Sequence, residues 1–252
     1  MSAVDHARAP HATKSPLRLF MILRQAFTLS NRCLLPGLVF GVSAEILFEI
    51  SAIFAPDDVV RTTLDLEEAF SLLLDSFVRI SILLIAASMH VGALTSLGLI
   101  AIRDETPQGM QALRHATKRF IPICAVFLIV GAAVLLGTVA LIIPGIWLFG
   151  VFAVVLPVAM VDGTILGAIK RSAALTAGYR WPVASLMVTL LVLSTILAQG
   201  AALLAGALND VAFGLGYPVA WLVSAWCALI VAQIAVALYL ELLSLSWSAE
   251  TA

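Results

Sequence analysis

Charged side chains are scarce in this 252-residue sequence, and their scarcity decides its class. Only 12% of the residues are Asp, Glu, Lys or Arg, whereas 62% are hydrophobic and the mean hydropathy is +1.09. Soluble domains hold about 25% charged and about 45–50% apolar residues. The composition therefore excludes an ordinary soluble domain and predicts an integral membrane protein.

Several chemical signatures are also missing. The three cysteines, Cys33, Cys124 and Cys227, are isolated and odd in number, so they form neither a disulfide framework nor a CxxC metal site. There is no HExxH motif, and the glycine pair at 214 and 216 follows no strand. We therefore predict a protein that is not an enzyme and that binds no cofactor, no metal and no nucleic acid.

One long stretch has no charge at all. The whole run between Arg119 and Asp162 contains no Asp, Glu, Lys, Arg or His. As a single helix it would extend about 63 Å, which is twice the thickness of the roughly 30 Å hydrocarbon core. Proline disfavours helix at the residue before it and glycine permits a turn, so we expect the chain to reverse at Ile143-Pro144-Gly145.

Comparing the length of each apolar segment with the length needed to cross the membrane predicts six transmembrane helices. Pro157 lies inside the short fourth segment and predicts a kink or an early end there. We expect an all-α membrane domain over 34–243, a tail over 1–33 that includes an interfacial helix, and a second tail over 244–252. The predicted spans are about 34–55, 77–101, 121–143, 146–161, 182–207 and 217–243.

The distribution of Lys and Arg predicts the orientation. Five lie before residue 33, four in the loop over 102–120 and three in the loop over 162–181, so twelve of the fourteen fall on one side. Loops rich in Lys and Arg stay in the cytoplasm, which is known as the positive-inside rule. The rule therefore predicts that both termini are cytoplasmic.

One of these polar segments has the pattern of a surface helix. Residues 16–31 place Phe20, Leu23 and Phe27 close to one face, as in a helix lying on an anionic leaflet, although an extension of the first span would also fit.

The segments 111–116 and 167–172, which lie in the two basic loops, resemble each other position by position. They indicate an internal repeat of helices 2 and 3 on helices 4 and 5, unless short basic loops have converged in composition.

Three ionisable side chains lie within predicted spans. Glu45 and Glu49 are one turn apart in the first helix, and His90 is near the middle of the second. Such groups are costly in a membrane, so they are functional candidates for proton transfer or cation binding. A polar clasp between two helices is the structural alternative.

A further set of motifs lies between residues 143 and 181, and it comprises Ile143-Pro144-Gly145-Ile146-Trp147, Pro157, Asp162, Ala168-Ile169-Lys170-Arg171-Ser172, Leu175-Thr176, Gly178 and Trp181. It resembles the motif of the membrane domain of glycerophosphoryl diester phosphodiesterases and of related stand-alone bacterial inner-membrane proteins. The similarity covers about residues 98–200. It implies a six-helix inner-membrane module without established chemistry. These 252 residues hold no counterpart of the catalytic domain of the fused members, so no phosphodiesterase activity is implied.

The motif has a structural and a binding interpretation. Structurally, Pro144 and Gly145 form an outer hairpin, Asp162 or Thr164 caps a short helix that Gly178 ends, and Trp181 anchors the interface. Alternatively, the basic cluster of Lys170, Arg171, Ser172 and Arg180 binds a lipid headgroup.

The sequence thus leads to two functional hypotheses. The first is a non-enzymatic, multi-pass module of the bacterial inner membrane that contacts membrane lipids, a protein partner or a second copy of itself through its basic loops. The alternative is a small permease or lipid transporter with a polar site at Glu45, Glu49 and His90.

Overall fold

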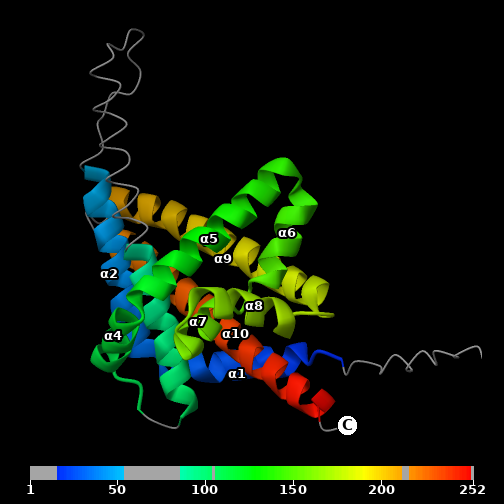
Figure 1. Ribbon diagram of the computed structural model, residues 1–252. Helices are drawn as coiled ribbons and strands as arrows, with labels where there is room; N and C mark the ends of the chain where they lie inside the picture. Colours follow the sequence, from blue (N-terminus) through cyan, green and yellow to red (C-terminus); the bar gives the residue numbers. More distant parts are fainter. Residues whose placement is uncertain (1–15, 54–85, 104–105, 212–215, 251–252) are drawn as a thin grey trace, which may run out of the picture.

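The computed structural model describes residues 16–53, 86–103, 106–211 and 216–250. Every regular element in these ranges is a helix, which confirms the all-α prediction (Figure 1). An apolar helix at Ala86–Ile102 lies between α2 and α4 in the sequence. The labelled helices are α1 (Leu19–Arg32), α2 (Leu34–Ile53), α4 (Gly109–Lys118), α5 (Phe120–Ala140), α6 (Ile142–Val151), α7 (Val155–Asp162), α8 (Ile165–Leu175), α9 (Arg180–Val211) and α10 (Gly216–Glu250).

Four stretches are long and apolar enough to cross a membrane: Phe120–Ala140, Ile142–Asp162, Arg180–Leu208 and Gly216–Ser248. In the apolar part of the first stretch, which is α5, only 12% is buried inside the protein, and in the third, which belongs to α9, only 11%. Both helices therefore expose apolar side chains on most of their surface. Such exposure is costly in water and normal in lipid. The described parts of the first two predicted spans lie in α2 (Leu34–Ile53) and in the helix Ala86–Ile102, and residues 54–55 and 77–85 of these spans lie outside the described ranges.

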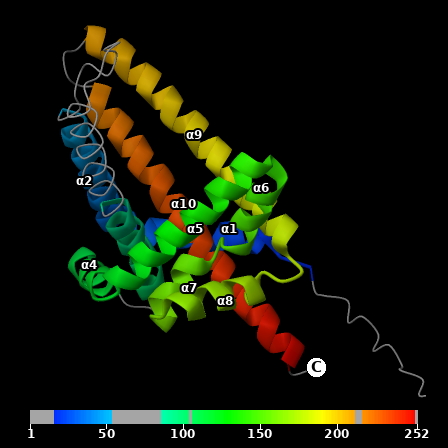
Figure 2. The ribbon, with the colours of Figure 1, turned by 45° about the horizontal axis from the view of Figure 1, so that its top comes forward.

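Helix α10 is the centre of the molecule. It packs against α9, α2 and α1, and Figure 2 shows it running between α2 and α9. Its side chains Ile234 and Leu238 are fully or almost fully buried in the largest core cluster, together with Ile22 of α1. Gln233 is also buried, and its Nε2 donates a hydrogen bond to the Leu94 carbonyl at 3.0 Å, which ties α10 to the helix 86–102.

The chain reverses between α5 and α6, as the length of the uncharged run predicted, but the turn lies earlier than expected. Leu141 is the extended residue at the reversal, with φ −161° and ψ 134°. Pro144 and Gly145 lie inside the first turn of α6, where a missing amide hydrogen costs little. The role of Gly145 is close packing, because a β-carbon there would meet the backbone of Thr138 on α5.

The kink expected in the fourth span is present. Helix α6 ends at Val151 and α7 begins at Val155, and the amide of Val155 donates to the carbonyl of Phe152 at 3.0 Å in a tighter turn. Pro157 is the third residue of α7, so it follows the break and needs no helical amide there.

Most of the segment predicted to lie at the interface, residues 16–31, forms α1, which is a helix separate from α2. Its position at a membrane interface stays a prediction. Cys33 interrupts the two helices, and α1 lies across α10 at the end of the molecule opposite the α5–α6 turn (Figure 1). Ile22, Ala26 and Leu29 are buried, whereas Phe20 and Phe27 are 77% and 58% exposed. The exposed aromatic face fits the predicted contact with a membrane surface.

The two basic loops fold into short helices with matching buried positions. Helix α4 buries Ala112 and Ala116, and α8 buries Ala168 and Ser172, which are the positions that the resemblance of the two segments pairs. The loops differ afterwards. Helix α5 follows α4 almost directly, whereas a turn with Gly178 at φ 89° separates α8 from α9. The internal repeat stays a prediction that these shared positions favour.

Candidate functional site

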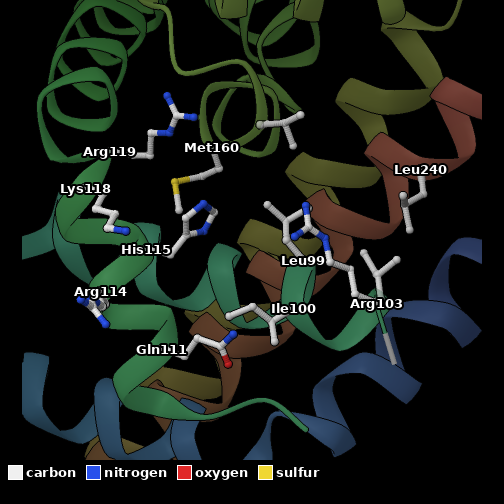
Figure 3. A pocket seen from close by; sticks show the side chains of 12 residues that line it. Leu99, Ile100, Arg103, Gln111, Arg114, His115, Lys118, Arg119, Met160 and Leu240 are labelled. Carbon is white, nitrogen blue, oxygen red and sulfur yellow. The ribbon is translucent and has the colours of Figure 1, made fainter. Parts of the chain in front are cut away.

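A pocket of about 480 Å³ lies where the helix 86–102 ends beside α4, with further lining residues from α7 and α10 (Figure 3). We call it the basic pocket, because no Asp or Glu is among its lining residues in the described part of the chain. Its walls include the apolar side chains of Leu99, Met160 and Leu240. Its polar lining residues are Arg103, Gln111, Arg114, His115, Lys118 and Arg119.

Helix α4 supplies most of these side chains through its periodicity. Residues 111, 114, 115 and 118 are spaced by three and four positions, so they share one face of the helix. Ala112 and Ala116, both fully buried, fix the other face against the core. Lys118 is in the last turn, where positive charge is favoured by the helix dipole.

Two arginines complete the pocket from outside α4. Arg119 packs its guanidinium over Gly163, which has φ 69°, and a β-carbon at that glycine would overlap the arginine side chain. The turn between α7 and α8 therefore holds Arg119 in place. Arg103 follows the helix 86–102, and Figure 3 shows that Arg103 and His115 extend into the same space.

The positive charge in the pocket acts on His115. The pKa of His115 is lowered from its ordinary value of 6.5, first by burial and then by the neighbouring charges of Arg119, Arg103 and Lys118. Each of these effects disfavours the protonated imidazole, so His115 is neutral at pH 7. A bound anion would offset the three cations and relieve the penalty on protonation.

The residues of the basic cluster predicted on the second loop have different surroundings and do not line one pocket with the first loop. Lys170 is exposed, and Arg171 pairs with Asp162 at 2.6 Å. Ser172 is fully buried and therefore has no exposed atom for a headgroup. The guanidinium of Arg180 stacks over the ring of Trp147, 4.7 Å from its centre.

Ser172 instead repairs the break between α6 and α7. Its hydroxyl donates to the Val151 carbonyl at 2.9 Å. The Thr176 hydroxyl has one hydrogen to donate and lies within reach of two acceptors, the Ser172 carbonyl of its own helix at 2.9 Å and the Val151 carbonyl at 3.2 Å. The break leaves the Val151 carbonyl without its usual helical partner, since the Val155 amide turns to Phe152. The predicted side-chain cap at the start of α8 is not seen: Thr164 makes no cap hydrogen bond, and Asp162 pairs with Arg171.

The intramembrane polar candidates are only partly brought together. Glu45 lines a large apolar cavity, whereas His90 does not line it and lies against the backbone of Phe40 on α2. The Nδ1 atom of His90 is buried without a hydrogen-bond partner among the described residues. The side chain of Glu49 lies outside the described part of the structure.

Sequence reasoning assigned lipid or protein contacts to both basic loops but named candidate headgroup-binding residues only on the second one, whereas the basic pocket lies at the first. The signal for the first loop was the spacing of Gln111, Arg114, His115 and Lys118. It could have been found from the sequence, although the approach of Arg103 and Arg119 depends on tertiary packing.

Comparison of the chain with known proteins gives no match to a protein-family model, to a curated protein or to a solved structure. The resemblance to the phosphodiesterase membrane domain therefore stays a prediction that rests on the motif between residues 143 and 181.

Proposed function

We propose that this chain is a non-enzymatic, six-span protein of the bacterial inner membrane whose basic pocket binds a phosphate-bearing anion, in particular the headgroup of an anionic lipid. The main support is that four Arg and Lys side chains cluster around a space of about 480 Å³. The described residues that line this space include no carboxylate. With the termini in the cytoplasm, as the basic loops favour, this pocket faces the leaflet surface where anionic headgroups gather.

The chemistry of the lining groups suits a phosphate diester. Guanidinium groups donate paired hydrogen bonds to phosphate oxygens, and Arg103 and Arg119 approach the pocket from different helices. A neutral His115 adds a further N–H donor. Leu99 and Met160 give the pocket apolar walls, and charge-assisted contacts are stronger beside apolar surface than in bulk water.

The transport alternative has one favourable observation, namely that Glu45 lines a cavity large enough for a solute. It also needs Glu45 and His90 to act together, and the described residues include no hydrogen bond or ion pair between them. Headgroup binding is therefore the better supported function.

Charge-matched variants test the proposal. Arg103→Gln/Lys118→Gln removes two lining cations, whereas Arg24→Gln/Lys170→Gln removes two exposed cations outside the pocket. Each Lys or Arg near an anionic headgroup contributes about 1 kcal/mol, so the first pair is expected to weaken phosphatidylglycerol binding about 30-fold. The second pair should have little effect. Binding is measured by native mass spectrometry of lipid titrations in detergent.

Two further ligands separate the sources of the phosphate. Zwitterionic phosphatidylcholine should bind more weakly than phosphatidylglycerol, and inorganic phosphate tests a soluble anion. Tighter binding of inorganic phosphate would assign the pocket to a free anion. Equal losses in the two charge-matched pairs would reject the pocket as the binding site.

The pH dependence of binding provides a second prediction. Since the pKa of His115 is held below 6.5 and an anion would raise it, binding of an anion and binding of a proton favour each other. Affinity for phosphatidylglycerol, whose diester does not titrate in this range, is expected to rise severalfold as the pH falls below 6.5. His115→Gln should flatten this profile. An equally steep profile in the variant would show that another group is responsible.

A further inference from the structure

A second, larger space lies between the apolar helices. This cavity of about 740 Å³, which we call the apolar cavity, is lined by residues of α2, the helix 86–102, α5, α6, α7, α9 and α10. Its volume is within the range of about 300–1,000 Å³ that is usual for small-molecule sites. In the part of the chain that the structure describes, Glu45 is its one ionisable lining side chain apart from the thiol of Cys227.

Four of the five hydroxyl groups in its described lining, all but that of Ser224, already donate within the protein. Thr95 donates to the Val91 carbonyl, Thr138 to the Val134 carbonyl and Thr195 to the Leu191 carbonyl, each at 2.8 Å and each within its own helix. Ser194 also donates to Leu191, at 2.9 Å. A hydroxyl that is bonded to its own helix has little left for a ligand, so the surface offered to an occupant is mostly hydrocarbon. Such a lining fits an acyl chain better than a polar solute.

The apolar cavity and the basic pocket are stacked along the same helices. On three helices, and at the start of α5, a residue of the cavity lies one or two turns from a residue of the pocket. At about 5.4 Å per turn, the two spaces are neighbours along the helix axes. The pairs are Thr95 with Leu99, Val126 with Arg119, Leu156 with Met160, and Ala235 with Leu240.

One small core cluster contains lining residues of both spaces. Met160 and Ile123 are 1% and 0% exposed and pack with Leu99 and Leu156 in a small core cluster. Met160 also lines the basic pocket. Methionine is unbranched and adapts readily to a new neighbour, so its displacement is the least costly way to join the two spaces.

We infer that the two spaces form one site for a single anionic phospholipid, whose phosphate lies among the cations of the basic pocket and whose acyl chain occupies the apolar cavity. The inference rests on the proposed headgroup binding and adds the second half of the ligand. The cations of the basic pocket complement the negative phosphate, and the hydrocarbon lining of the apolar cavity suits an acyl chain. A charged end next to an apolar end is also the arrangement within a lipid molecule in the leaflet.

Photolabelling in nanodiscs tests this inference. Phosphatidylglycerol and phosphatidylcholine analogues carry the same diazirine on the acyl chain, and labelled residues are mapped by mass spectrometry. The cavity side of α5 is reported by Val130 and Val134, and its outer side by Leu128 and Ile129, which are 49% and 48% exposed. We expect the anionic analogue to label the cavity side at least fivefold more than the zwitterionic one, while both label the outer side.

Two variants separate the halves of the site. Gly131 lines the cavity and a β-carbon there meets nothing within 4 Å, so Gly131→Phe is expected to fill the space without a clash. It should remove cavity labelling and leave inorganic phosphate binding unchanged. Gly200→Phe is the matched control on α9, since Gly200 also has open space but does not line the cavity. Arg103→Gln/Lys118→Gln should reduce cavity labelling by the anionic analogue to the level of the zwitterionic one.

The outcomes that overturn the inference differ from those that overturn the proposed function. Labelling confined to Leu128 and Ile129, with phosphate binding intact, would remove the acyl-chain half and leave the headgroup pocket. Equal cavity labelling by both analogues would show a chain site that is independent of the cations. Absence of phosphate and phosphatidylglycerol binding in the wild-type protein would remove the proposed function itself.

Discussion

Replacement of Gly145 by leucine is expected to lower the free energy of unfolding by about 3 kcal/mol, because it forces α5 and α6 apart. A β-carbon at position 145 would lie 2.7 Å from both the Cα and the N of Thr138. These are backbone atoms, so the clash cannot be relieved by a change of rotamer. On the facing helix, a β-carbon at Gly137 would lie 3.2 Å from the Cα of Gly145, so the close approach is shared by both glycines.

The measurement is the thermal unfolding midpoint of the purified protein in detergent. A loss of about 3 kcal/mol corresponds to a decrease of roughly 6–12 °C for a domain of this size. Gly200→Leu provides the control, since a β-carbon there meets nothing within 4 Å and should change the midpoint little. Equal midpoints for the Gly145→Leu variant and the wild type would show that the two helices are not held at this distance.

Gly145 also shows how far the sequence could lead. The length of the uncharged run required a reversal, and the reversal is present because no helix of that length fits a membrane. Its position was misplaced, since proline and glycine are typical of turns but are also tolerated in the first turn of a helix. What selects glycine at 145 is the backbone of Thr138, a neighbour that local sequence patterns do not reveal.

The candidate site was predictable to a similar degree. Charge counting located both basic loops, because the asymmetry of Lys and Arg is a property of the sequence. It could not show that Asp162 neutralises Arg171 on one loop, while the other loop gathers its cations around a pocket with no described carboxylate in its lining. That difference depends on how α8 and α4 pack. The same holds for Gly163, whose missing side chain makes room for Arg119 from a segment much earlier in the chain.

The other large effect is expected at the break between α6 and α7, where two hydroxyls lie within reach of one acceptor. Ser172 and Thr176 are both fully buried, and the Ser172 hydroxyl donates at 2.9 Å to the carbonyl of Val151, a residue that is only 4% exposed. The Thr176 hydroxyl lies 2.9 Å from the Ser172 carbonyl and 3.2 Å from the Val151 carbonyl, so it can turn to Val151 when the Ser172 hydroxyl is removed. The double variant Ser172→Ala/Thr176→Val removes both hydroxyls within reach of the Val151 carbonyl. An unsatisfied buried polar group costs about 1–3 kcal/mol, and the loss of both hydrogen bonds adds to it, so we expect a total of about 3 kcal/mol.

The shared acceptor makes the effect cooperative, and this distinguishes it from simple loss of packing. Either single variant still leaves one hydroxyl to satisfy Val151, so each should cost about 1 kcal/mol or less, and the double variant should exceed their sum. Thermal midpoints of the four proteins in the cycle measure the coupling. Thr195→Val is the control, because its hydroxyl bonds within α9 at an exposed position and its removal should be nearly neutral. Strict additivity would mean that Val151 finds another partner, and that the serine and threonine of the motif contribute only volume.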